Sequence, residues 1–291
     1  MDRLTSLPSE TLWQVLSYLT VHDLSCIRLA SRKLSLFADH PSHWRHLDLT
    51  PPVQQSTETS LSRPSSSPSS KPPCLKLWNL KDLQRLIGPH RNMIKSIRIW
   101  GVRDNIVRYI LLHCLNLTEL TLCGWATLSD HAFKHIHPET KLNRLRLVGA
   151  QDQPNYTAMD ATTLAYLLMQ CPLKELSLGC QVHIHAQTLL LELNRKRPAA
   201  SSTIDKIRHS SKGSSLHLER LTLSTRRTWS SEHVVALFDA CPSLHHVCLF
   251  PAAAAGGFDL TQAKKMNDTT DNQQDQQHYV EGTHMTIHRS T

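Results

Sequence analysis

The sequence lacks a long hydrophobic run and a recognisable export signal. Hydrophobic residues make up 40% of the 291 positions, yet no apolar run approaches the roughly 20 residues that a membrane-spanning helix needs. The segment from Met1 to Thr5 has neither the basic start nor the continuous apolar stretch of a secretory signal. We therefore expect a cytoplasmic and/or nuclear protein without a membrane partner. We also expect its sequons at Asn116, Asn155 and Asn267 to stay unmodified.

The sequence also lacks any C-x-x-C pair, which removes the usual zinc-ribbon and redox signatures. Its eight cysteines would suffice for a disulfide framework in an exported protein. Because no export signal is present, a reducing compartment is the better assumption. We expect free thiols.

Catalytic signatures are missing as well. The chain contains no G-x-S-x-G elbow, no G-x-x-x-x-G-K-[ST] phosphate loop, no H-E-x-x-H and no G-x-G-x-x-G. His131 and His135 lie four residues apart with His137 close by, but no Glu or Cys completes a metal site at usable spacing. The pair His113-Cys114 suggests a nucleophile, yet Cys114 occupies a structural position described below. We expect a non-catalytic protein with no cofactor, no metal and no catalytic residue.

The net charge of +8 raises the alternative of a nucleic-acid-binding protein. The basic residues are densest in the segment 195–212, which contains six Lys or Arg residues and one acidic residue, Asp205. Nucleic-acid binding through this segment would fall steeply with salt. A low-complexity basic insertion explains the patch with fewer assumptions, so nucleic acid is not expected as a partner.

Two segments have too little apolar material to fold. Residues 51–74 are rich in Ser and Pro, and residues 255–291 contain Gly256-Gly257 followed by a Gln-, Asp-, Asn- and Thr-rich stretch. Such compositions are typical of disorder. We predict a disordered linker at 51–74 and a disordered tail at 255–291.

The first fifty residues predict three short helices. Pro8 suits the first turn of a helix, and apolar residues follow it at the three- and four-residue spacing of one helical face. A second helix is predicted to begin near Asp23, and a third spans roughly residues 32–39 before Pro41 ends it. Three helices in about 45 residues bury little surface, so this unit is expected to need a partner.

The order and spacing of these residues resemble the F-box pattern. The resemblance covers residues 4–49 and rests on Leu7-Pro8-Ser9-Glu10, Leu12, Val15-Leu16, Tyr18-Leu19, Asp23-Leu24, Ile27-Arg28-Leu29, Ser31-Arg32-Lys33 and Trp44. One departure is Leu34, where the family often has an aromatic residue. The resemblance implies an F-box domain at residues 1–50 that binds a Skp-family adaptor and, through it, a cullin. The residues expected to bind the adaptor are Leu7, Pro8, Glu10, Leu12, Val15, Leu16, Leu19, Leu24, Ile27 and Leu29.

A second feature is an internal repeat. The pattern L-x-x-L-x-L, with Ile or Val allowed, occurs six times, at Ile94/Ile97/Ile99, Leu117/Leu120/Leu122, Leu142/Leu145/Leu147, Leu173/Leu176/Leu178, Leu218/Leu221/Leu223 and Leu244/Val247/Leu249. Trp44/Leu47/Leu49 has the same spacing and predicts a first strand that leaves the F-box. Helical patterns lie between the copies, at 106–114, 129–136, 161–169, 187–193 and 231–240.

Alternating strands and helices at this period resemble the leucine-rich repeat. Cys114, Cys171 and Cys241 each close a helix just before the next strand, as in the cysteine-containing repeats found behind many F-boxes. The ninth repeat positions hold neither Asn nor Cys but Val102, Trp125, Ala150, Gln181, Arg226 and Ala252. The predicted fold class is therefore α/β, with a three-helix F-box followed by a short, irregular leucine-rich-repeat solenoid at 75–254. It comprises about six strand-helix units with a parallel sheet.

In such strands the residues between the inward leucines share one exposed face. That face is predicted to carry Arg98, Trp100, Glu119, Thr121, Arg144, Arg146, Glu175, Arg220, His246 and Phe250. Exposed aromatic residues beside arginines are typical of protein-binding hot spots. The residues expected to bind a protein client are Arg98, Trp100, Glu119, Arg144, Arg146, Arg220 and Phe250.

These observations predict a substrate-recognition subunit of a Skp-cullin-F-box ubiquitin ligase. The F-box binds the adaptor, the repeats bind an unidentified client, and tethering raises the client's effective concentration. The alternative is an F-box scaffold or interaction module without a role in ubiquitination.

Overall fold

The computed structural model describes residues 4, 6–51, 77–125, 127–149, 156–182, 184–195, 216–225, 229–251 and 285–289. Most of the predicted linker at 51–74 lies outside these residues. The same holds for most of the basic segment 195–212 and for most of the predicted tail at 255–291.

The chain begins with a group of short helices, which we call the helical region (residues 9–44). Its members are α1 (Ser9–Ser17), α2 (Val21–Ala30), α3 (Arg32–Ala38) and α4 (Pro41–Trp44). A capping box starts α2, because the Thr20 side chain accepts from the Asp23 N–H and the Asp23 carboxylate accepts from the Thr20 N–H, both at 3.2 Å. The three predicted helices are confirmed. Pro41 not only follows α3 but also opens α4, since proline fits the first helical turn.

Most of the remaining described chain is built on a mostly parallel sheet. We call residues 46–49 and 77–251 the sheet region. Seven strands run parallel in chain order, β1 (His46–Leu49), β2 (Ser96–Trp100), β3 (Glu119–Cys123), β5 (Arg144–Val148), β7 (Glu175–Val182), β8 (Arg220–Thr225) and β9 (His246–Pro251). The short strands β4 (Thr127–Ser129) and β6 (Tyr156–Ala158) pair beside this path. All six strands predicted from the repeat are present. The predicted first strand, β1, joins the helical region to the same sheet.

The strand register explains why the repeat folds this way. One apolar position of each strand aligns across the sheet as Leu47, Ile97, Leu120, Leu145, Leu176, Leu221 and Val247. The position two residues later aligns as Leu49, Ile99, Leu122, Leu147, Leu178, Leu223 and Leu249. Side chains two apart in a strand share a face, so both rows enter one continuous hydrophobic core.

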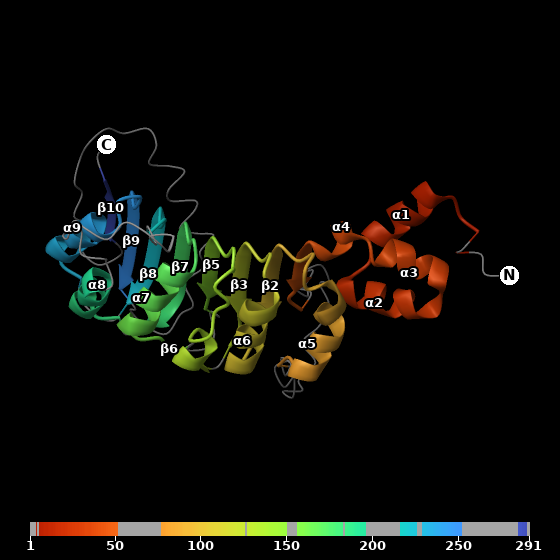
Figure 1. Cartoon of the computed structure of the whole chain (residues 1–291), viewed down its shortest axis with the longest axis horizontal. Coiled ribbons are helices and arrows are strands. Elements are labelled where there is room, and N and C mark those ends of the chain that lie inside the picture. The colour runs from red at the N-terminus through yellow and green to blue at the C-terminus, as the bar shows by residue number, and fades with distance from the viewer. Residues whose placement is uncertain are drawn as a thin grey trace, which may run out of the picture.

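Helices cover the apolar side of the sheet. They are α5 (Leu80–Ile87), α6 (Asp104–His113), α7 (Ala161–Gln170), α8 (Ala186–Arg195) and α9 (Ser231–Ala240), with the single 3-10 turns η1 (Gly88–His90) and η2 (Asp130–Ala132). In Figure 1 the strands follow one another along the long axis, these helices line one side, and α1 to α4 form the N-terminal end. No helix of the described residues covers the opposite side of the sheet, which we call its open face.

One prediction about these helices needs correction, and one helix was not predicted. The pattern at 129–136 forms only the one-turn η2, because the preceding residues extend as β4 and pair with β6. The segment around α5 gave no repeat signal, yet Asn79 caps a helix there by accepting from the Lys81 N–H at 3.1 Å.

The strand entries are more regular than the missing Asn or Cys ladder suggested. The Arg45 carbonyl accepts from the N–H groups of Lys95 and Ser96 at 2.8 and 3.0 Å. The same double acceptance recurs at the carbonyls of Lys95, Thr118, Asn143, Lys174 and Glu219. Backbone groups therefore satisfy one another where the strands begin. The irregularity lies at the strand exits, where the β7–β8 register shifts between Leu178 and Val182.

A strand from the predicted disordered tail completes the sheet. β10 (Met285–His288) pairs antiparallel with β9 and forms the last edge. The prediction of a disordered tail did not include this strand.

Candidate functional site

The predicted adaptor-binding residues divide into two groups in the helical region. Leu12, Leu16 and Leu24 are buried within its core, with Leu12 and Leu16 at 0% exposure. They hold the helices together and are not presented to a partner. Leu7, Leu19 and Ile27 are half-buried, whereas Pro8 and Glu10 are exposed, as are Val15 and Leu29.

The helical region exposes large apolar side chains that folding leaves uncovered. Leu29 of α2 is 85% exposed and Leu36 of α3 is 77% exposed. Tyr18, directly after α1, is 80% exposed, and Val15 within α1 is also exposed. We call these four residues the exposed apolar set. Exposed leucine and tyrosine on a small unit with little core of its own are typical of segments that bind another protein.

Tyr18 and Leu36 were missed as site residues in the sequence. Leu36 follows the buried Leu34 by two positions, and residues two apart on a helix do not face the same side. Leu29 follows the buried Leu24 by five positions and likewise leaves the core. Helical phase counted from the buried leucines therefore identifies the outward residues.

A compact joint connects the helical region to the sheet region. The indole of Trp44 is fully buried, donates to the Ala38 carbonyl at 2.7 Å and stacks on the His90 ring at 3.6 Å between centroids. Arg28 places Nη1 3.2 Å from His90 Nε2 and Nε 3.1 Å from an Asp39 carboxylate oxygen. Helices α2 and α3 thus contact the turn after α5 directly.

The pKa of His90 is lowered to about 4, mainly by burial and also by the Arg28 guanidinium, while Asp39 opposes the shift. The ring is therefore neutral near pH 7 and accepts a hydrogen bond from Arg28. Arg28 in turn pairs with Asp39. Because both regions contribute to this cluster, they are held in one orientation.

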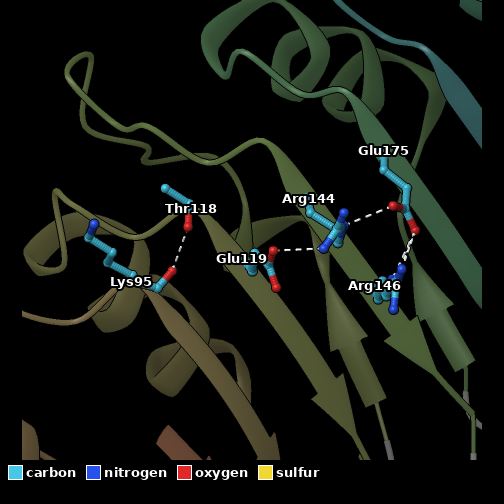
Figure 2. A network of polar contacts seen from close by, with 6 residues as sticks. All are labelled: Lys95, Thr118, Glu119, Arg144, Arg146 and Glu175. Atoms are coloured by element: carbon cyan, nitrogen blue, oxygen red, sulfur yellow. Dashed lines mark hydrogen bonds and ion pairs between the residues drawn. The ribbon is translucent and has the colours of Figure 1, made fainter. Parts of the chain in front are cut away.

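The open face of the sheet carries a row of alternating charges. Glu119, Arg144, Glu175 and Arg220 are register partners on β3, β5, β7 and β8. Arg144 Nη1 lies 2.7 Å from Glu119 Oε1, and Arg144 Nε lies 2.8 Å from Glu175 Oε2. Figure 2 shows Arg144 between the two glutamates, with Arg146 on the same strand turned toward Glu175 at 2.6 Å.

The charge row begins at Glu119, directly after a hydrogen bond that joins the starts of β2 and β3. The Thr118 hydroxyl donates to the Lys95 carbonyl at 2.9 Å (Figure 2). The contact fixes the turn into β3 just before Glu119. Strand entry and charge row are therefore positioned by the same backbone stacking.

The charges do not balance at the β8 end of the row. Both oxygens of Glu175 are engaged by Arg144 and Arg146, and Glu219 pairs with Lys174 at 2.9 Å. Within the part of the chain that the structure describes, no carboxylate forms an ion pair with Arg220. A shallow pocket of about 220 Å³ lies here, lined by Glu119, Asn143, Arg144, Lys174, Glu175, Glu219 and Arg220. Lys174 and Glu219 were not among the predicted client-binding residues, because they precede the strands.

The pKa of His246 is lowered to about 4, mainly by burial and also by the nearby His288, Arg220 and His245. His246 is the register partner of Arg220 on β9. Near pH 7 this end of the face therefore presents the Arg220 guanidinium beside neutral histidine.

The two aromatic residues predicted on this face differ in position. Trp100 is half-buried and lies across Gly124, which adopts a φ of 56° and leaves room for the indole. A Cβ on Gly124 would meet ring atoms of Trp100 at 2.1 Å. Phe250 is only 6% exposed, so its predicted role as an exposed client-binding residue needs correction. Alternation along β9 predicts which side Phe250 faces. It does not predict that the side chain is buried there. Arg98 is exposed on β2, as predicted.

The cysteines at the helix ends are structural. Cys114, Cys171 and Cys241 are the C-caps of α6, α7 and α9, and each N–H donates to the carbonyl four residues earlier. Burial raises the pKa of each thiol to about 12, so none is a thiolate near neutral pH. Three further cysteines, Cys26, Cys123 and Cys248, are free thiols like these three.

The described residues contain no group of three His, Cys, Asp or Glu side chains that would hold a metal ion. Within the same residues, no helix has the length and apolar character needed to cross a membrane.

Comparison with known protein families supports the F-box resemblance. A family profile described as F-box-like matches residues 4–50, well under half of the chain. A comparison with curated proteins finds no match. The matched segment contains α1 to α4 and β1, together with the exposed apolar set. The chain therefore carries an F-box-like domain, a kind of domain that binds Skp-family adaptors.

Proposed function

We propose that this chain is the substrate-recognition subunit of a Skp-cullin-F-box ubiquitin ligase. In this proposal residues 1–50 bind the Skp-family adaptor, which contacts the cullin. Residues 75–254 form an irregular leucine-rich-repeat solenoid that binds a protein client. The bond-forming chemistry belongs to other subunits, and this chain contributes proximity.

The observation that carries the proposal is the coincidence of the F-box-like match with the exposed apolar set. Covering one exposed leucine at an interface contributes about 1.5–3 kcal/mol, or roughly 10- to 100-fold in affinity. Tyr18, Leu29 and Leu36 together offer enough apolar area to anchor an adaptor. Because these side chains are exposed, they do not contribute to the small core of the helical region.

The arrangement of the sheet region supports the client-binding part of the proposal. Its open face is uncovered by helices, and its charge row ends at Arg220, which has no carboxylate ion-pair partner among the described residues. Because the joint at Trp44 and His90 fixes the two regions together, a client on this face would be held at a set orientation to the adaptor.

Capture by a purified Skp-family adaptor tests the first half. The full chain should be retained, and Leu29→Asp should weaken retention at least tenfold because a charge would replace a buried leucine at the interface. Leu191→Asp on α8 is the matched control, since Leu191 is also exposed and lies in the sheet region. Leu16→Asp is unsuitable, because Leu16 is buried and its replacement would unfold the helices.

Ubiquitination tests the second half. The adaptor-bound chain with cullin and a charged ubiquitin-conjugating enzyme should modify proteins that the sheet region captures. Adaptor binding without any such modification would favour the scaffold alternative. Failure of the wild-type chain to bind any Skp-family adaptor would reject the proposal.

A further inference from the structure

The C-terminal strand β10 occupies an edge that would otherwise be open. It pairs antiparallel with β9 over four positions, Met285 with Leu249, Thr286 with Cys248, Ile287 with Val247 and His288 with His246. All other neighbours on the main path of the sheet are parallel. An edge strand presents unpaired N–H and C=O groups that accept another extended segment.

Side-chain contacts make this edge selective. Ile287 packs against the hydrophobic core, and the Thr286 hydroxyl lies 3.4 Å from the Cys248 sulfur. Arg289 donates to the carbonyl of Pro242 at 3.2 Å, and its N–H donates to the His245 carbonyl at 3.2 Å. The edge therefore accepts an aliphatic residue at the Ile287 position with polar residues on either side.

The resident strand is short. Only four residues pair with β9, and residues 252–284 separate the two strands in sequence, so closing this loop costs entropy. Short edge strands with few buried contacts open at low free energy. An extended segment from another protein would compete with β10 for the same groups.

The charges beside β10 indicate what would compete best. The His288 ring lies 4.8 Å from the His246 ring, and Arg220 is the next register partner of His246. His245 and Arg220 add basic groups beside His246, while Glu219 is paired with Lys174. A carboxylate at the His288 position would be attracted to these groups, whereas His288 is not.

We infer that the outer edge of β9 is a strand-docking site and that residues 285–289 are its resident, exchangeable occupant. The partner that it fits is an extended peptide segment that adds antiparallel to β9. This segment has an aliphatic residue at the Ile287 position and an acidic residue at the His288 position. The inference goes beyond the proposed function and does not depend on adaptor binding.

The test uses a fluorescent peptide of residues 283–291 and the full chain, with binding followed by anisotropy. The Ile287→Asp chain should bind the peptide at least tenfold more tightly than the wild-type chain, because its own strand no longer occupies the edge. Val235→Asp, at an exposed position of α9, is the control and should behave as wild type. A His288→Glu peptide should bind several-fold more tightly than the unmodified peptide, and an Ile287→Asp peptide at least tenfold more weakly.

A reversible lock keeps the test independent of the stability of the Ile287→Asp chain. Thr286→Cys places a thiol directly opposite Cys248 in the antiparallel pair, a distance that a disulfide spans. The oxidised chain should bind the peptide at least tenfold more weakly than the same chain after reduction. Equal peptide binding by the oxidised and reduced chains, or no binding by the Ile287→Asp chain, would overturn the inference. Adaptor capture by these variants should be unchanged, so the result is separable from the proposed function.

Discussion

The helical region and the sheet region differ in the side chains that they expose. Seven large hydrophobic residues are exposed among the described residues, and four of them are the exposed apolar set of the helical region. The sheet region, although much longer, exposes only Met93, Leu191 and Val235. On its open face the charges of Glu119, Arg144, Arg146 and Glu175 neutralise one another. The region that leaves more apolar surface exposed is the one that carries the F-box-like match.

The largest loss of stability is expected at the joint between the two regions. Trp44→Ala removes a fully buried indole, its hydrogen bond to Ala38 and its stacking on His90, and should cost about 3–5 kcal/mol of unfolding free energy. Urea unfolding measures the loss. The control Leu36→Ala removes an exposed side chain and should change stability by less than about 0.5 kcal/mol. Similar losses for both variants would show that the joint does not couple the regions.

A backbone change within the sheet region should have the next largest effect. Gly124→Ala forces a Cβ into the Trp100 indole and an alanine into the left-handed region, at a cost of about 2 kcal/mol or more. Gly88→Ala is the matched control, because Gly88 has a helical φ of −51° and its Cβ would meet only the Tyr109 hydroxyl at 3.8 Å. Thermal unfolding should separate the two variants by several degrees. If both melt alike, Trp100 is not fixed over Gly124.

Acid should weaken the joint. The pKa of His90 is about 4 when folded and near 6.5 in an unfolded chain, so the unfolded state takes up a proton first as pH falls below about 6.5. Unfolding free energy should therefore decrease toward pH 4, by up to about 1.4 kcal/mol per pH unit, with no contribution above neutral pH. His90→Gln should flatten this slope. An unchanged slope in that variant would assign the acid sensitivity elsewhere.

The charge row should contribute least. Glu175→Gln removes the partner of Arg144 and Arg146, yet these groups are partly exposed, so the loss should stay within about 1 kcal/mol and shrink in high salt. Glu139→Gln, an exposed position without an ion pair in the described chain, should have no effect. A salt-independent loss of several kcal/mol of unfolding free energy in Glu175→Gln would contradict this expectation. It would mean that the charge row stabilises the fold and does not serve mainly for binding.

The strands were predictable because their physics is local and periodic. The inward leucines recur at a spacing of two, and parallel stacking of identical spacings leaves one register that buries them all, as at Leu47, Ile97 and Leu120. The helices α7, α8 and α9 also followed from their apolar spacing. The pattern at 129–136 failed because pairing of β4 with β6 overrode it.

Other features depend on contacts that the sequence does not display. β10 is a four-residue segment in a polar stretch, and only the free edge of β9 makes it a strand. The sequence pattern identified the F-box-like segment but not which of its leucines face outward, since Leu16 and Leu29 both match the pattern. The burial of Phe250 was likewise not visible in the strand alternation, which placed it on the open face.

The exposed apolar set is proposed to bind a Skp-family adaptor. Titration calorimetry with the purified adaptor should compare the wild-type chain, the combined Tyr18→Asp, Leu29→Asp and Leu36→Asp variant, and the combined Leu191→Asp and Val235→Asp control. We predict at least a hundredfold loss of affinity in the first variant at an unchanged melting temperature, and less than a twofold change in the control. Equal affinity of all three chains, or no binding by the wild-type chain, would contradict the account.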